Sequence, residues 1–157
     1  MNNWLIDKGG IYVVIQFFLF GLIWLAPASV MAWSSLWISI GKAVGLPLLI
    51  YGFVMLSFGL FNLGRNLQAE PHPKDNATLV THGAYNLVRH PIYSGIILGW
   101  TGWGLWQSGE VTAMLASVVL FIFFDIKTRR EERMLMAKFP DYEVYRQRVK
   151  KLIPYVY

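Results

Sequence analysis

Two short polar stretches carry the residue types in this chain that are able to do chemistry. The first is RHPIYSG, in which Arg89 and His90 stand directly before a long apolar run. A charged side chain near hydrocarbon costs at least about 2.5 kcal/mol, so its presence needs a reason such as topology, capping or catalysis. Histidine changes charge near neutral pH, which suits it both to bind a ligand and to take up a proton.

The second stretch is KTRREERMLMAKFPDYEVYRQRV, which begins at Lys127. Lys127 and Glu131 are four residues apart, so they share one face of a helix. The charge pattern described below places this stretch on the same side of a membrane as RHPIYSG. Together the two stretches can therefore surround a pocket at the membrane boundary.

Both stretches also have plain structural interpretations. Arg89 can anchor the topology, and His90 can serve as a polar cap. Pro91 can start a helix, because its missing N–H costs nothing in the first turn. Lys127 and Glu131 can belong to a solvated charged face. The spacing alone leaves these alternatives open.

Composition indicates a membrane protein. Of the 157 residues, 55% are hydrophobic and 15% are charged, and the length suits a single domain over residues 1–157. The chain contains no cysteine, which excludes disulfides, thiolate metal sites and a cysteine nucleophile.

Four apolar segments predict an all-α integral membrane protein with about four transmembrane helices. The segments cover residues 11–26, 43–61, 92–106 and 111–126. A span needs about 20 residues, so the last two segments are short and are expected to form a hairpin of short spans. The remaining polar parts are a loop, 62–91, and a tail, 127–157, which we expect to form the pocket.

The basic residues predict an orientation. Of the fourteen lysines and arginines, twelve lie in the loop or the tail. With four spans, both regions fall on the same side as the N-terminus, and the basic excess marks that side as cytoplasmic. We expect a bacterial inner membrane with both termini in the cytoplasm. Because these charges already serve topology and contact with membrane lipids, they do not indicate a nucleic-acid partner.

Two further patterns concern helix packing. The pairs Gly41 with Gly45 and Gly95 with Gly99 match G-x-x-x-G, which lets two membrane helices approach closely. In the tail, apolar and aromatic residues recur every three or four positions, and Pro140 interrupts them. We therefore expect two helices in the tail, with the second capped by Asp141.

Taken together, LVTHGAYNLVRHPIYSG, REERMLMAKFPDYEVYRQRV and a following IP resemble the isoprenylcysteine carboxyl methyltransferase family, including its short bacterial members. The resemblance covers residues 62–154. The chain is also similar to phospholipid N-methyltransferases and to a group of denitrification-associated membrane proteins. The resemblance implies a membrane enzyme that uses S-adenosylmethionine without a Rossmann domain.

The resemblance also implies roles for individual residues. The residues expected to bind the cofactor are Leu79, Val80, Tyr85, His90, Pro91, Tyr93 and Glu131. Glu131 would contact its polar end. The expected catalytic residues are Arg89, His90 and Lys127, where Lys127 stands at a position near the acceptor that is arginine in eukaryotic members. No metal is expected.

The methyl acceptor stays open from sequence. A lipophilic or small molecule with a carboxylate, thiol or amine is compatible, and an amine or thiol would need His90 as a base. An apolar acceptor can enter sideways between the second span and the hairpin. One alternative is a non-catalytic membrane subunit or chaperone that keeps the pocket as a scaffold. A metal or haem protein using His72, His82 and His90 is a further alternative, but the spacing of these histidines matches no common ligand pattern. A small transporter is another, but the first three spans contain no charged residue that could serve as a relay. The oligomeric state is not predicted.

Overall fold

The computed structural model describes residues 9–25, 34–69, 72–107 and 111–157. The helices are α2 (Gly10–Leu25), α3 (Ser35–Leu63), α4 (Pro91–Gln107), α5 (Val111–Lys138) and α6 (Tyr142–Arg148), with the 3-10 turns η1 (Gly64–Asn66) and η2 (Gly83–Asn86) between α3 and α4. Over these residues the only β-type pairing outside a strand is an isolated bridge between Val88 and Lys150, and no strand forms. The all-α class is therefore confirmed for the described chain.

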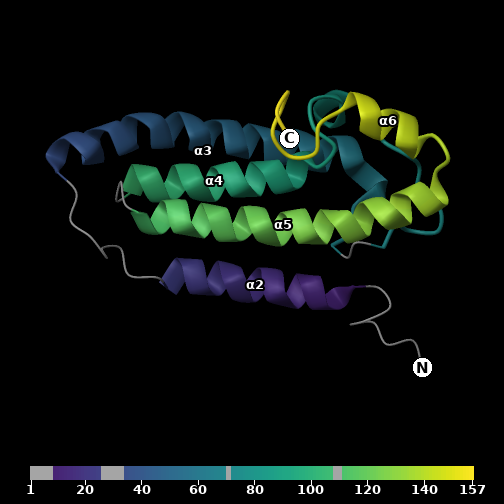
Figure 1. Cartoon of the computed structure of the whole chain (residues 1–157), viewed down its shortest axis with the longest axis horizontal. Coiled ribbons are helices and arrows are strands. Elements are labelled where there is room, and N and C mark those ends of the chain that lie inside the picture. Colours follow the sequence, from purple (N-terminus) through teal and green to yellow (C-terminus); the bar gives the residue numbers. More distant parts are fainter. Residues whose placement is uncertain (1–8, 26–33, 70–71, 108–110) are drawn as a thin grey trace.

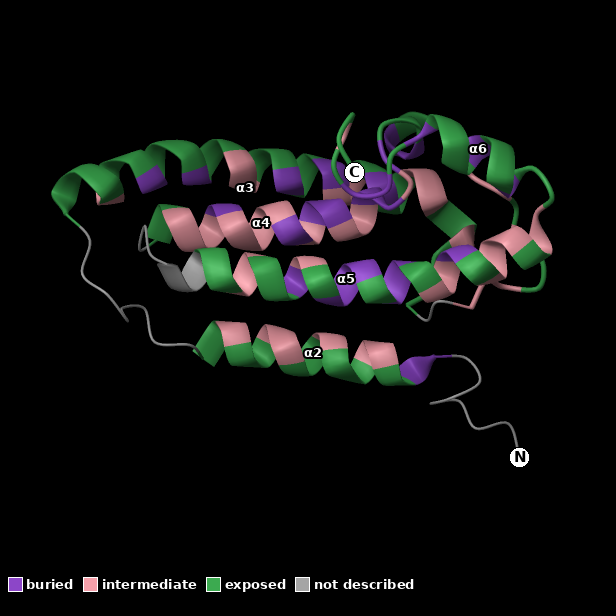
Figure 2. Ribbon diagram, in the orientation of Figure 1, coloured by how far each residue is buried: buried purple, intermediate pink, exposed green. Residues whose placement is uncertain are grey.

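The four long helices lie alongside one another with alternating direction (Figure 1). As a result, the start of α2, the end of α3, the start of α4 and the end of α5 all lie at one end of the molecule, together with α6. Large apolar side chains on the outer helix surfaces are exposed, as Figure 2 shows along α2 and α3. Within the described residues, one helical stretch, Ser35–Asn66, is both long and apolar enough to cross a membrane.

The helices differ from the predicted segments at two places. The helix containing the second segment begins at Ser35 rather than near 43, and it continues through Pro47. The fourth segment does not end at 126, because α5 runs on to Lys138 and includes the first part of the predicted tail. The two predicted tail helices are confirmed, with the break at Pro140, but the first of them is the continuous end of α5. Asp141 does precede α6, but its side chain makes no capping hydrogen bond.

Glycines bring α3 and α4 into backbone contact. A Cβ built on Gly95 would lie 2.5 Å from the amide nitrogen of Leu56, and one on Gly45 would lie 2.7 Å from the carbonyl oxygen of Gly102. A Cβ on Gly52 would lie 2.8 Å from Gly99 Cα. A Cβ on Gly99 itself would meet nothing within 4 Å. The contacting glycines thus recur every seven residues, which keeps them on one helix face. A side chain at Gly99, which was predicted to pair with Gly95, would not point into this contact.

We expect Gly52→Ala and Gly99→Ala to have opposite effects on stability. Overpacking a tight helix contact costs about 1–3 kcal/mol, because the two backbones must separate. Filling open space at Gly99 instead removes the glycine penalty, worth about 0.5–1 kcal/mol in a helix. Thermal unfolding of both variants in one detergent measures the difference. Equal losses of stability in the two variants would contradict the packing described here.

A buried ion pair joins the segment before α4 to the polar half of α5. Arg89 Nε donates to Glu132 Oε1 at 2.8 Å, and both side chains are less than a tenth exposed. Arg89 Nη1 also donates to the backbone carbonyls of Arg146 and Val149. The main chain adds hydrogen bonds from Arg89 N to the Lys150 oxygen at 2.8 Å and from His90 N to the Lys151 oxygen at 3.1 Å. The C-terminal segment is thus fixed against the RHP motif.

This network controls the ionisation of Glu132. Burial by itself would raise the pKa of Glu132, but hydrogen bonds from His90 and Arg89 outweigh it and lower the pKa from 4.5 to about 2. A lowered pKa means that the ionised carboxylate is favoured in the folded protein relative to the unfolded chain. The resulting stability is fully present above about pH 4.5 and is lost as the pH falls toward 2.

Replacing Glu132 with glutamine tests this network. At pH 7 we expect Glu132→Gln to lower the free energy of unfolding by about 3 kcal/mol, because the buried Arg89 loses its counter-ion. The gap between variant and wild type should narrow between about pH 4.5 and 2, where the wild-type carboxylate takes up its proton. Chemical denaturation across that range in a non-ionic detergent measures both effects. A gap that stays constant with pH would contradict the assignment.

Candidate active site

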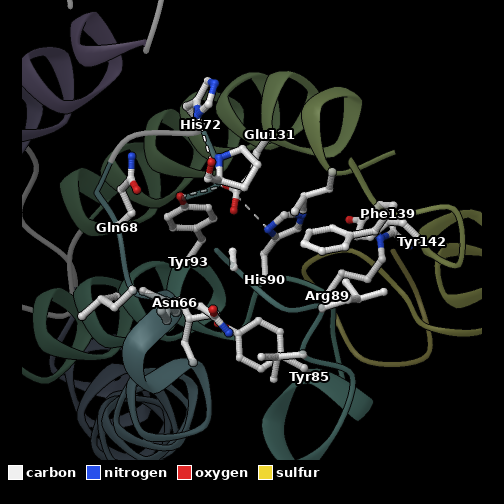
Figure 3. A pocket seen from close by; sticks show the side chains of 18 of the residues that line it. Asn66, Gln68, His72, Tyr85, Arg89, His90, Tyr93, Glu131, Phe139 and Tyr142 are labelled. Atoms are coloured by element: carbon white, nitrogen blue, oxygen red, sulfur yellow. Dashed lines mark hydrogen bonds and ion pairs between the residues drawn. The ribbon is translucent and has the colours of Figure 1, made fainter. Parts of the chain in front are cut away.

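A cavity of about 410 Å³ lies at the end of the molecule where the loop and the tail meet. Its wall comes from the end of α3, loop residues within 66–69 and 72–80, the RHP motif, the first turns of α4, the polar half of α5, and α6 (Figure 3). This volume is within the range of small-molecule sites in proteins, about 300–1,000 Å³. The cavity can therefore hold a ligand of cofactor size.

Asparagines at the end of α3 hold the loop that forms one wall. Asn66 Oδ1 accepts from the backbone amide of Thr78 at 3.1 Å, and Asn66 Nδ2 donates to the backbone carbonyl oxygen of Thr78 at 3.2 Å. Asn62 Oδ1 accepts from the Ala84 amide at 2.9 Å, where the chain turns at Gly83 with a φ of 62°. That positive φ and the closeness of the Asn62 side chain both require glycine at Gly83. The loop is thus held by side chains at both ends.

His90 lies between the two adjacent glutamates of α5. His90 Nε2 is 3.1 Å from Glu132 Oε1, and Nδ1 is 3.9 Å from Glu131 Oε2. Tyr93 donates its hydroxyl to the same Glu131 oxygen at 3.0 Å, as the dashed lines in Figure 3 show. Because Glu132 is ionised, Nε2 of His90 can donate to it, which leaves Nδ1 facing Glu131. A carboxylate, a phenol and an imidazole thus meet at one point of the cavity wall.

Lys127 is buried on the side of the cavity that faces α2. Its side chain lies 2% exposed, and Nζ donates to Gln16 Oε1 at 2.8 Å. The ammonium also lies 5.0 Å from the centre of the Tyr93 ring, close enough for a cation–π interaction. The cavity therefore has a positive group at one end and the carboxylate of Glu131 one helical turn away.

The opposite end of the cavity is aromatic and apolar. Its wall there contains Leu79, Leu135, Phe139, Tyr142 and Tyr145, which pack as one cluster. The hydroxyl of Tyr145 donates to the backbone carbonyl oxygen of Tyr85 at 2.6 Å. The hydroxyl of Tyr142 is buried and has no hydrogen-bond partner among the described residues. Burial raises the pKa of Tyr142 well above its usual range, so this hydroxyl stays protonated and can donate.

The structure brings almost all the predicted site residues to this cavity. Its wall includes Leu79, Val80, Tyr85, Arg89, His90, Tyr93, Lys127 and Glu131. Pro91 is different: it is buried at the start of α4, behind the wall and next to Gly59. Arg89 reaches the wall, but its guanidinium is bound by Glu132 and by backbone carbonyls.

Three residues that shape the cavity were not predicted. Glu132 could have been suspected from its position beside Glu131, but sequence does not tell which of two adjacent glutamates faces a ligand. Tyr142 belongs to the stretch REERMLMAKFPDYEVYRQRV that carries the resemblance, but no role in a site was predicted for it. Gln16 is a lone amide in an apolar segment, and nothing in the sequence indicates that it meets Lys127.

The described residues contain no group of three or more histidines, aspartates or glutamates able to hold a metal ion. Of the three histidines, His72 and His90 line the cavity, with His90 between the two glutamates, and His82 is exposed. The described geometry offers no support for the metal or haem alternative.

A second, apolar groove of about 370 Å³ lies beside the cavity. It runs between α2, α3 and α4 and is lined by Phe20, Trp24, Leu49, Gly52, Phe53, Leu56, Gly95, Ile96, Gly99, Trp100 and Trp103. Ile96 lines both the groove and the cavity, so the two spaces are neighbours. The groove opens on the apolar outer surface, where a hydrocarbon chain can lie.

Comparison with known proteins gives a family match and several named relatives. A model of the phospholipid methyltransferase family matches residues 40–142. The chain is 32% identical over 116 residues to a probable protein-S-isoprenylcysteine O-methyltransferase of Oryza sativa subsp. indica, covering 72% of this chain and 61% of that protein. The enzyme of that name from Schizosaccharomyces pombe is 33% identical over 122 residues, covering 75% of this chain and 51% of that protein.

Another relative has a different kind of name. The cobalt-zinc-cadmium resistance protein CzcN of Cupriavidus metallidurans is 35% identical over 124 residues, covering 78% of this chain and 53% of that protein. The chain thus spans little more than half the length of the relatives it matches.

The fold also matches a solved structure. The eukaryotic intramembrane Ras methyltransferase ICMT superposes with a TM-score of 0.68 over 99% of this chain and 55% of that one, at 23% identity. This likeness shows a shared membrane fold. Since the family match covers well over half of the chain, the chain belongs to the phospholipid methyltransferase family, and isoprenylcysteine O-methyltransferases are among its relatives.

Proposed function

We propose that this chain is an integral membrane methyltransferase that binds S-adenosylmethionine in the cavity and methylates a lipophilic or small acceptor. The observation that carries the proposal is the convergence of two clusters distant in sequence. His90 and Tyr93 come from the RHP segment, Glu131 comes from α5, and all three meet at one wall within 3.9 Å. The relatives named as methyltransferases support the same activity.

The residues of the cavity fit the chemical groups of this cofactor. Glu131 and the Tyr93 hydroxyl suit the ammonium of its amino acid part, since a carboxylate forms the stronger, charge-assisted hydrogen bond. The aromatic and apolar end suits a flat adenine ring. There the unpartnered hydroxyl of Tyr142 can donate to a ring nitrogen, which would satisfy a polar group that is otherwise buried without a partner.

In a methyl transfer of this kind, the protein mainly has to align two reactants and exclude water. The cofactor supplies a methyl group on a positively charged sulfur, from which an acceptor takes it by in-line displacement. The packed aromatic wall excludes water, and the loop held by Asn62 and Asn66 fixes the donor side. If the acceptor is an amine or a thiol, Nδ1 of His90 can take up its proton. A carboxylate acceptor needs no base.

The membrane arrangement follows from the helices and their charges. We infer that α2, α3, α4 and the apolar half of α5 cross the bilayer, so that the polar end with the cavity faces the cytoplasm of a bacterial cell. The short α2 and α4 fit a locally thinned bilayer. The groove between α2, α3 and α4 gives a lipophilic acceptor a way into the cavity from the side, next to Ile96.

A non-catalytic role is the second candidate. The relative named for cobalt, zinc and cadmium resistance carries no mention of methyl transfer in its name. A protein of that kind could keep the same cavity as a scaffold. It would tolerate Glu131→Ala without loss of its own activity, whereas an enzyme would lose methyl transfer.

Binding of S-adenosylmethionine to the purified protein tests the proposal. We expect Glu131→Gln to weaken binding about tenfold or more, because a hydrogen bond to a charged group is worth about 1.5–3 kcal/mol. The matched control is Glu143→Gln, which changes an exposed glutamate on α6. Isothermal titration in detergent measures the affinities. A wild-type protein that does not bind the cofactor, or a Glu131→Gln variant that binds normally, would contradict the proposal.

We expect Tyr142→Phe to weaken cofactor binding without lowering the stability of the empty protein. The variant removes a buried hydroxyl without a partner, so the empty protein should become as stable as wild type or slightly more stable. The same change should weaken binding of S-adenosylmethionine by about fivefold, since the donor to the ring is lost. Thermal unfolding with and without cofactor measures both. Lower stability together with unchanged affinity would show that the hydroxyl serves the fold alone.

A further inference from the structure

Asp125 lies on α5 where the apolar half of the helix meets the polar half. Its carboxylate accepts from Lys151 Nζ at 2.5 Å and from the Tyr157 hydroxyl at 2.7 Å. Asp125 and Lys151 are each only 7% exposed. Lysine is almost never buried to this degree unless it is paired. Neither residue is among those that line the cavity, so this buried ion pair has no part in the site described above.

Lys151 uses its side chain and its main chain for two different partners. Its ammonium is held by Asp125, whereas its carbonyl oxygen accepts from the backbone amide of His90 at 3.1 Å. The carbonyl oxygen of the preceding residue, Lys150, accepts from the backbone amide of Arg89 at 2.8 Å. The main chain of two residues of the cavity wall therefore rests on a segment that Asp125 holds in place.

The next residue of this segment, Leu152, is bound on both sides. The buried Ser94 hydroxyl on α4 lies 2.7 Å from the carbonyl oxygen of Leu152 and 3.0 Å from that of His90. The Leu152 side chain is 2% exposed and belongs to the same core cluster as Phe124 on α5. Residues 150–152 thus lie between the start of α4 and the middle of α5, with contacts to both.

We propose that Asp125 is a positioning residue for the cavity, which acts through Lys151 on the main chain of His90. By fixing that main chain, it sets the direction in which the imidazole faces Glu131. This rests on the proposed function, since the direction of His90 matters only if the cavity binds a ligand. A hydrogen bond to a carbonyl places His90 only as well as the carbonyl itself is placed, and a buried ion pair is favourable only in a narrow geometry.

An ion pair that served the fold alone would change the free energy of unfolding and leave the folded site as it is. Lys151→Met separates the two roles, because it cuts the link while Asp125 keeps its hydrogen bonds from Tyr157 and Arg129. In the full chain in detergent, we expect the amides of Arg89 and His90 to exchange with deuterium about tenfold faster than in wild type. The affinity for S-adenosylmethionine, measured by isothermal titration, should fall about fivefold.

Two control variants show what a change in stability alone does. Arg129→Gln removes a donor to the other oxygen of Asp125, at 2.8 Å, and leaves Lys151 in place. Thr101→Val removes a hydrogen bond of 2.6 Å between α4 and α5, about 15 Å along α4 from Pro91. In both variants the exchange of the Arg89 and His90 amides and the cofactor affinity should stay within about twofold of wild type.

Asp125→Asn alone leaves Lys151 buried without a counter-ion and is expected to fold poorly. The double variant Asp125→Asn with Lys151→Met removes both charges, so it should fold and show the same fast exchange as Lys151→Met. Thermal unfolding reports which variants are folded.

Unchanged exchange at Arg89 and His90 in Lys151→Met and in the double variant would overturn the proposal. So would equally fast exchange in Thr101→Val, or fast exchange in Lys151→Met with normal cofactor affinity, since the pair would then serve the fold alone. A wild type that does not bind the cofactor would instead count against the proposed function. The exchange rates would still decide whether Asp125 fixes the main chain of His90.

Discussion

The buried pair of Arg89 and Glu132 is the interaction on which the cavity depends. It joins segments more than forty residues apart in sequence, and the guanidinium also holds the carbonyls that end α6. A buried arginine is costly unless its donors are satisfied, and here the guanidinium donates to a carboxylate and to two backbone carbonyls. The consequence is that His90, the next residue, has little freedom. Its ring is placed between Glu131 and Glu132 before any ligand arrives.

Much of this arrangement could be predicted from sequence, because apolar segments and basic residues report directly on helices and on their polar end. The meeting of His90 with Glu131 was predicted from the shared side of the two motifs and from the family resemblance. The extension of α5 to Lys138 was not, since charges after Asp125 resemble the start of a tail although the helix continues. The glycine contacts were assigned to the wrong spacing, because a pattern of small residues does not show which partner backbone lies opposite Gly99. A tertiary contact such as that of Gln16 with Lys127 cannot be predicted from local sequence patterns.

The two ends of the cavity differ in their chemistry. Near Tyr142 the wall is aromatic, and the buried Tyr142 hydroxyl has no hydrogen-bond partner among the described residues. Near Lys127 the wall is positive and lies beside an apolar groove. Tyr93 lies between them, with its hydroxyl on Glu131 and its ring beneath Lys127. Under the proposed function, the cofactor and the acceptor would bind at these two ends, on either side of Tyr93.

The glycine contacts give the walls of the cavity unequal stiffness. Helices α3 and α4 touch backbone to backbone at Gly45, Gly52 and Gly95, whereas α2 is held largely by rings, among them Phe20 stacked on Trp100. Stacked rings slide more readily than interlocked backbones separate. If a bulky amphiphile entered or left the groove, α2 would therefore move first, and α3 and α4 would keep their contact. Under the proposed function, such a protein could exchange the acceptor while the cofactor stays bound.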